Sequence, residues 1–184
     1  MTGKFLFAAT LALVAAPAAA AVTVIGNSSA RLCYEAAEAR MAPSFESLGR
    51  CDQALNQEAL SEDDRNATFV NRGILYMRSG NLEAALSDYD RAIAADPRLG
   101  EAYLNKGLAL VRAGRDWDKA ILLFNTALEN RARRPAIAHY GRAIAYEAEG
   151  HLKEAYFDYR EATRLDPKWR DPQVELARFS VKRP

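Results

Sequence analysis

The chain has 184 residues, of which 49% are hydrophobic and 27% are charged, and its formal net charge is +1. This length is typical of one domain, and the near-neutral charge gives no reason to expect nucleic acid or an anionic membrane as a partner. The sequence contains no glycine-rich phosphate loop, no nucleophile elbow and no His-Glu-x-x-His motif. We therefore expect a protein without enzymatic activity, cofactor or metal.

Residues 1–20 have the composition of a secretory signal peptide. One lysine precedes an apolar run that ends before Pro17, and alanines follow, so cleavage is expected after Ala20 or Ala21. A membrane anchor is the less favoured alternative, because the run is shorter than the roughly 20 residues that span a bilayer. The sequence predicts an exported protein with no membrane span after cleavage, periplasmic if the host is Gram-negative.

Residues 21–65 contain an irregular entry segment and two expected helices, which begin near Ser28 or Ser29 and near Ser44. Cys33 and Cys51 are the only cysteines, and one falls in each helix. A short turn between antiparallel helices brings such positions together, and an oxidising compartment favours a disulfide. Two buried free thiols and a redox pair are the alternatives.

A unit of about 34 residues then recurs three times, over residues 66–99, 100–135 and 136–169. In each copy a first helix carries large and small residues on one stripe, and a second helix carries an alanine and an aromatic residue. The small residues of the first helices are expected to face alanines of the second; they are Gly73, Gly107 and Ala143, opposite Ala85, Ala120 and Ala155. The middle copy has one extra residue in its turn, Asp116.

This spacing of large residue, glycine, tyrosine, alanine, aromatic residue and proline resembles the tetratricopeptide repeat family. The resemblance implies an all-α, right-handed superhelix of stacked antiparallel helix pairs. Residues 21–65 then form a degenerate first pair, and residues 170–184 form a capping helix and tail. The sequence departs from the family pattern at two positions. His139 stands where the pattern has a large apolar residue, and Arg72, Lys106 and Arg142 stand where it usually has an apolar one.

The resemblance also implies a groove for a peptide, lined by the first helix of each pair. Carried over by position, the groove residues are Val70, Asn71, Ile74 and Arg78, then Leu104, Asn105, Leu108 and Arg112, then Tyr140 and Ile144. The equivalent asparagines can hold a peptide amide, and the equivalent arginines can bind a carboxylate. Arginines that cap helix ends or are solvated are the alternative. The basic run 131–134 is expected to be a solvated loop or a contact for an acidic partner.

We thus expect a protein- or peptide-binding module that acts as an adaptor or assembly factor in the cell envelope. A self-associating structural module and an accessory subunit of an enzyme acting on the cell wall are the alternatives. The sequence predicts neither the partner's identity nor the oligomeric state.

Overall fold

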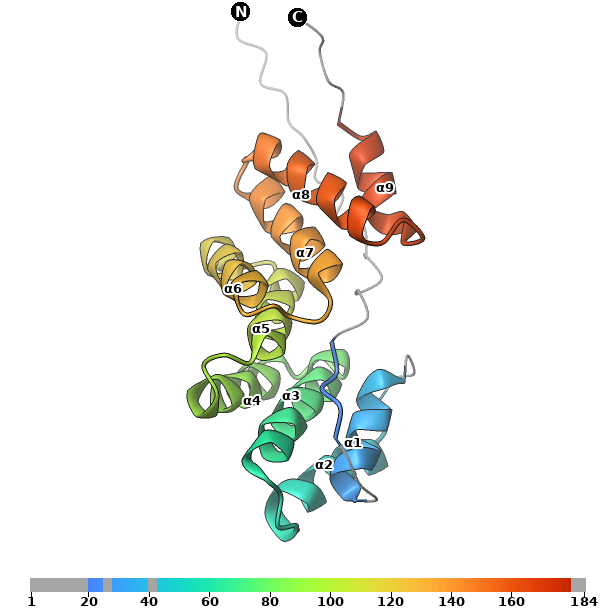
Figure 1. Cartoon of the computed structure of the whole chain (residues 1–184), viewed down its shortest axis with the longest axis vertical. Coiled ribbons are helices and arrows are strands. Elements are labelled where there is room, and N and C mark those ends of the chain that lie inside the picture. The colour runs from blue at the N-terminus through green and yellow to red at the C-terminus, as the bar shows by residue number, and fades with distance from the viewer. Residues whose placement is uncertain (1–19, 25–27, 40–42, 180–184) are drawn as a thin grey trace, which may run out of the picture.

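The computed structural model describes residues 20–24, 28–39 and 43–179, so most of the expected signal peptide and the end of the expected tail lie outside the described residues. Within these ranges the chain forms nine helices and no strand, arranged along one long axis (Figure 1). They are α1 (Ser29–Glu38), α2 (Phe45–Gln57), α3 (Glu62–Arg78), α4 (Leu82–Ala95), α5 (Gly100–Ala113), α6 (Trp117–Glu129), α7 (Pro135–Ala148), α8 (Leu152–Leu165) and α9 (Arg170–Ala177).

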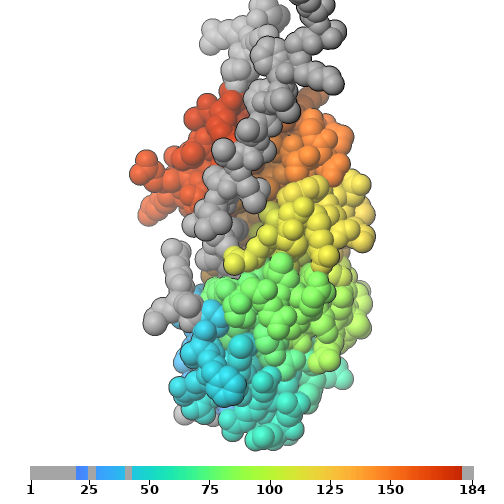
Figure 2. Space-filling view, turned by 180° about the vertical axis from the view of Figure 1, so that it is seen from behind, coloured from blue at the N-terminus to red at the C-terminus, as the bar shows by residue number. Residues whose placement is uncertain are grey.

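Consecutive helices pack as pairs, and each pair packs on the next. The pairs are α1 with α2, α3 with α4, α5 with α6 and α7 with α8, while α9 packs on α8. Contacts of α4 with α5 and of α6 with α7 join successive units, and α1 and α2 both pack on α3. Figure 2 shows the same order of units from the opposite side. The fold is therefore the predicted all-α solenoid.

Side-chain caps define several helix starts. The hydroxyls of Ser28 and Ser44 accept hydrogen bonds from backbone N–H groups in the first turns of α1 and α2. Ser61 caps α3 in the same way. The last helix, α9, begins at Arg170, and Pro172 lies inside its first turn.

The extra residue of the middle unit has a clear structural role. Asp116 adopts a left-handed conformation with φ of 54° and lies directly before α6. Arg131, in the longer link that follows α6, has φ of 55°. The extra residue expected from the sequence, Asp116, thus falls where the backbone reverses direction, and an added residue there leaves the helices intact.

The repeated spacing of glycine and aromatic residue in the first two units reflects close packing. A Cβ atom built on Gly73 would lie 2.5 Å from Cε1 of Tyr89, and one built on Gly107 would lie 2.8 Å from Cε1 of Phe124. These glycines make room for the aromatic ring of the second helix, so the nearest neighbour is the ring and not the alanine that we expected.

Cys33 and Cys51 form a disulfide between α1 and α2, with 4.9 Å between their Cα atoms. Both residues are fully buried. The bond joins the two helices that depart furthest from the repeat pattern, as the sequence predicts.

Candidate functional site

An extended segment of the chain, residues 20–24, lies against the first helices of two units and is held by two asparagines. The N–H of Val22 donates to Oδ1 of Asn71 at 2.8 Å, and Nδ2 of Asn71 donates to the Val22 carbonyl oxygen at 2.7 Å. Nδ2 of Asn105 donates to the carbonyl oxygen of Ala20 at 3.1 Å. In Figure 1 this segment is the blue trace beside α1 and α3. We call the surface formed by α3, α5 and α7 the inner face.

The two asparagines use their hydrogen-bonding capacity unequally. The amide of Asn71 is satisfied by both main-chain groups of one residue, Val22. Asn105 donates to Ala20 and also to the carbonyl oxygen of Glu101, one turn earlier in its own helix. Its Oδ1 is buried and has no hydrogen-bond partner among the described residues. The second asparagine therefore retains an unused acceptor beside the segment.

The apolar residues expected in the groove form one buried cluster with the segment. Ala20 and Ala21 are 2% and 8% exposed, and both belong to this cluster. Its members include the expected groove residues Val70, Ile74, Leu104 and Leu108. The small side chains of the segment thus occupy part of the inner face, and these groove residues are not open to solvent.

The two equivalent arginines have different surroundings. Nη1 of Arg78 donates to the carbonyl oxygen of Ala39 at 2.6 Å, at the C-terminal end of α1. Burial lowers the pKa of Arg78 below its ordinary value. Arg112 is exposed. Arg78 therefore binds a helix end, as in the alternative interpretation, whereas Arg112 is exposed to solvent.

The third unit does not continue the row of asparagines. Gly141 takes the equivalent position, and a Cβ atom there would lie 2.4 Å from Cζ of Phe124, so no side chain fits. Tyr140 is fully buried, with its ring centroid 4.7 Å from that of Trp169. Ile144 is half-buried and packs in the same cluster. The expected groove residues of this unit therefore lie in a core that the C-terminal segment covers.

The basic link before α7 contacts the N-terminal part of the chain. Nη1 of Arg133 donates to Oγ1 of Thr23 at 3.3 Å, and the backbone N–H of Arg133 donates to Glu101. Nη2 of Arg134 lies 3.3 Å from Oε1 of Glu38 at the end of α1. These residues are thus partnered within the chain, and Arg133 helps to hold the extended segment against the inner face.

A buried ion cluster joins the first two helix pairs of the chain at the side chain of Arg72. Its Nε and Nη2 atoms each donate to Asp88 at 2.7 Å, and Nη1 donates to Asp52 at 2.6 Å. Burial alone would lower the pKa of Arg72, but the hydrogen bonds and charges of Asp88 and Asp52 raise it above its ordinary value. Arg72 thus binds Asp88 in its own unit and Asp52 in the preceding helix pair, and so links the two.

The third unit repeats this cluster. Arg142 donates to both carboxylate oxygens of Asp158 at 2.7 Å and to Oδ1 of Asn125 in the preceding unit at 2.5 Å. Nδ1 of His139 lies 2.7 Å from Oδ1 of Asp158. Burial tends to raise the pKa of Asp158, but the hydrogen bonds from Arg142 and His139 lower it below its ordinary value. His139 therefore completes an ion cluster instead of only filling an aromatic position.

Sequence reasoning noted these charged residues but missed their partners. The available signal was an aspartate sixteen positions after each arginine, at Asp88 and Asp158. The middle unit has Leu123 at the corresponding position, and its Lys106 pairs instead with Asp90 of the preceding unit. The charges at this position are thus internal links between units and not a binding surface.

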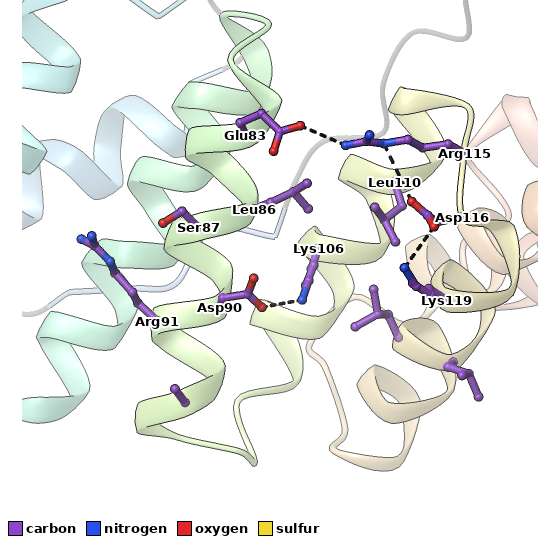
Figure 3. A pocket seen from close by; sticks show the side chains of 13 residues that line it. Glu83, Leu86, Ser87, Asp90, Arg91, Lys106, Leu110, Arg115, Asp116 and Lys119 are labelled. Atoms are coloured by element: carbon purple, nitrogen blue, oxygen red, sulfur yellow. Dashed lines mark hydrogen bonds and ion pairs between the residues drawn. The ribbon is translucent and has the colours of Figure 1, made fainter.

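A hollow lies between α4, α5 and α6 (Figure 3). Its volume is about 880 Å³, and charged side chains border an apolar floor. Glu83 pairs with Arg115, and Asp116 pairs with Lys119. Leu122 at its margin is 63% exposed. The charges of both signs are paired with one another, so the hollow presents no concentrated charge to a ligand.

The described residues contain no group of three or more His, Cys, Asp or Glu side chains that could hold a metal ion. None of the described helices is both long enough and apolar enough to cross a membrane.

Comparisons with known proteins agree with this architecture. Residues 73–114 match a family model described as TPR repeat, and residues 136–169 match one described as tetratricopeptide repeat. The first TPR of Spaghetti (RPAP3), bound to an HSP90 peptide, is 25% identical with a TM-score of 0.57, and the match covers 61% of this chain and 87% of that one.

Two further solved structures share the fold. The Arabidopsis OM64 TPR domain is 20% identical with a TM-score of 0.60, and the match covers 64% of this chain and 96% of that one. The second TPR domain of human RPAP3, in complex with an HSP70 peptide, is 23% identical with a TM-score of 0.59, and the match covers 66% and 100% of the two chains.

Proposed function

Because the chain is a tetratricopeptide repeat protein, we propose that it binds an extended stretch of a partner protein on its inner face. It acts without chemistry of its own, as an adaptor or assembly factor in the cell envelope. The observation that carries this proposal is the pair of hydrogen bonds between the Asn71 amide and the main chain of Val22. An asparagine amide that pairs with both the N–H and the carbonyl oxygen of one extended residue can bind a peptide whatever amino acid stands at that position of the peptide.

The surroundings of Asn71 suit the same role. Val70 and Ile74 flank it on α3, Leu104 and Leu108 come from α5, and all four are apolar. Rigid helices hold these groups in place before binding, which keeps the conformational entropy cost of association low. The Spaghetti structure, which contains an HSP90 peptide, supports a peptide as the ligand class. Arg112 is the exposed cation that a carboxylate on the partner would meet.

The proposed location in the envelope rests on two observations. Residues 1–20 have the pattern of a secretory signal peptide. The disulfide between Cys33 and Cys51 suits an oxidising compartment such as the periplasm. An exported protein of this kind would meet its partner outside the cytoplasm.

Affinity capture from the native envelope tests the proposal. The mature wild-type protein and an Asn71→Ala/Asn105→Ala variant are used as bait in parallel, and the bound proteins are identified by mass spectrometry. Asn56→Ala is the matched control, because Asn56 is an exposed asparagine on α2, away from the inner face. We expect a partner that the wild type and the control retain and the double variant loses.

Capture of the same partner by all three baits would place binding on another surface, such as the hollow between α4 and α6. Circular dichroism compares the fold of the double variant with that of the wild type. An unchanged spectrum shows that the partner is lost because the binding contacts are gone and not because the variant unfolds.

A further inference from the structure

We propose that residues 20–24 are a built-in ligand of the inner face, which a partner must displace, and that their chemistry indicates the partner's: an uncharged, extended peptide with small side chains. This inference rests on the proposed function and names the ligand class of the same site.

The first argument is the geometry of the main chain. Val22 offers its N–H and its carbonyl oxygen to a single amide, that of Asn71, at 2.8 and 2.7 Å. Two residues earlier, the carbonyl oxygen of Ala20 accepts from Asn105. Alternate residues of an extended chain point the same way. The segment is therefore bound in a two-residue register by equivalent asparagines of neighbouring units, as a separate peptide would be.

The second argument is the size of the side chains that the inner face accepts. Ala20 and Ala21 are almost completely buried in the same cluster as the groove residues, whereas Thr23 is exposed. Val24 is also buried, but it packs against small residues of α1, α2 and α3 at the N-terminal helix pair. No charged side chain of the segment enters this face. A competing peptide must therefore present small or β-branched residues at the buried positions.

The third argument is that the segment satisfies the site incompletely. The buried Oδ1 of Asn105 has no hydrogen-bond partner among the described residues, whereas Oδ1 of the equivalent Asn71 accepts an N–H. A buried acceptor without a donor is unfavourable. A peptide that donates an N–H to Asn105 would form one hydrogen bond more than the segment does. The built-in ligand is thus a weaker match than the site permits, which makes displacement feasible.

The segment compensates by being attached to the fold. Residues 25–28 separate Val24 from α1, so the segment is held close to its site at a high effective concentration. A free peptide with the same contacts would compete poorly. Cleavage after Ala20 leaves residues 21–24 and both hydrogen bonds between Val22 and Asn71 on the mature chain but removes Ala20 and its bond to Asn105. Cleavage after Ala21 would in addition convert the Val22 amide into an amino terminus.

Hydrogen–deuterium exchange of the wild-type protein processed after Ala20, in which Val22 retains its backbone amide, tests occupancy. We expect the amide of Val22 to exchange at least about tenfold more slowly than in an unstructured peptide, because its N–H is bonded to Asn71. Val22→Pro removes that donor and should release the segment. Val22→Ala retains the N–H and is the matched control. Free exchange of Val22 in the wild type would overturn the proposal.

A binding measurement tests the ligand class. The probe is a fluorescently labelled Ala-Ala-Val-Thr-Val peptide with blocked ends, titrated into each variant and followed by anisotropy. We expect Val22→Pro to bind it at least about tenfold more tightly than Val22→Ala, because the competing segment is released. Adding Asn71→Ala to Val22→Pro should abolish this gain. Equal binding by the two Val22 variants would contradict the proposal.

The two proposals fail differently. Absence of any captured partner would count against the proposed function, while protection of Val22 would still stand. A partner captured through the inner face, with Val22 exchanging freely, would refute the built-in ligand alone. If both hold, Val22→Pro should capture more partner than the wild type does.

Discussion

The guanidinium of Arg72 forms two hydrogen bonds of 2.7 Å with the carboxylate of Asp88, sixteen residues later on the second helix of the same unit. The side chain of Asp88 is 3% exposed and that of Arg72 is 11% exposed, so the pair is largely removed from water. Such a pair holds two helices in a fixed orientation, but each charge depends on the other.

Asp88→Ala should therefore lower the free energy of unfolding by about 3 kcal/mol, because it leaves the buried Arg72 with only Asp52 as a partner. Urea denaturation followed by circular dichroism measures the loss. The middle unit suggests the rescue, since it has Lys106 and Leu123 at these positions. Arg72→Lys combined with Asp88→Leu should recover much of the stability. A double variant no more stable than Asp88→Ala would show that the pair is not the cause.

Acid should weaken the cluster around Asp158. Burial tends to raise the pKa of the Asp158 carboxyl, but the hydrogen bonds from Arg142 and His139 lower it by a larger amount. The folded-state pKa therefore lies below the unfolded value of about 3.9. The ionised carboxylate therefore stabilises the fold above about pH 4, and this contribution is lost as the pH falls through the folded-state pKa.

The test is the free energy of unfolding as a function of pH for the wild type and Asp158→Asn. We expect the variant to be less stable at pH 7 and to lose less stability on acidification. Parallel curves for the two proteins would mean that other carboxylates account for the acid sensitivity.

Loss of the disulfide should destabilise the N-terminal helix pair most. Cys33 and Cys51 are eighteen residues apart, and closing a loop of this length contributes about 3 kcal/mol in the chain-entropy model. Cys33→Ala/Cys51→Ala avoids placing new hydroxyls in the buried site. Exchange measurements should show faster opening of α1 and α2 than of α7 and α8. Uniform loss of protection along the chain would contradict this local role.

Glycines in different settings should respond oppositely to alanine. Gly73→Ala would place Cβ 2.5 Å from the Tyr89 ring and should cost about 1–3 kcal/mol through overpacking. Gly49 in α2 has no neighbouring atom within 4 Å of a Cβ, so Gly49→Ala should be neutral or stabilise by up to about 1 kcal/mol. Melting temperatures of the two variants provide the comparison. Equal shifts would mean that helix propensity, not packing, decides both positions.

Much of the architecture was predictable because the repeat spacing encodes it locally. Helices α4 and α8 end before the aspartate of each Asp-Pro pair, as proline requires of the residue before it. Ser28 and Ser44 cap the helices that the sequence placed after them. These features depend on a few neighbouring residues, which a sequence pattern records directly.

The state of the inner face was not predictable in the same way. The sequence identified Asn71 and Asn105 as equivalent, but residues 20–24 carry no periodic pattern that assigns them to these asparagines. Tyr140 matched a groove position, yet Trp169 packs on it from after α8. Both outcomes depend on contacts between residues far apart in the chain, which helical spacing does not encode.

The position of residues 20–24 also affects how the chain folds. Stacked helix pairs mostly join residues close in sequence, which favours rapid folding. The segment instead bonds Ala20 to Asn105, 85 positions away, and Thr23 to Arg133, 110 positions away. These bonds form only after the stacked helices that carry Asn105 and Arg133 are in place. A newly made chain therefore passes through a stage in which residues 20–24, although synthesised before the helices that they contact, are not yet in place, and the inner face is open to a partner during that interval.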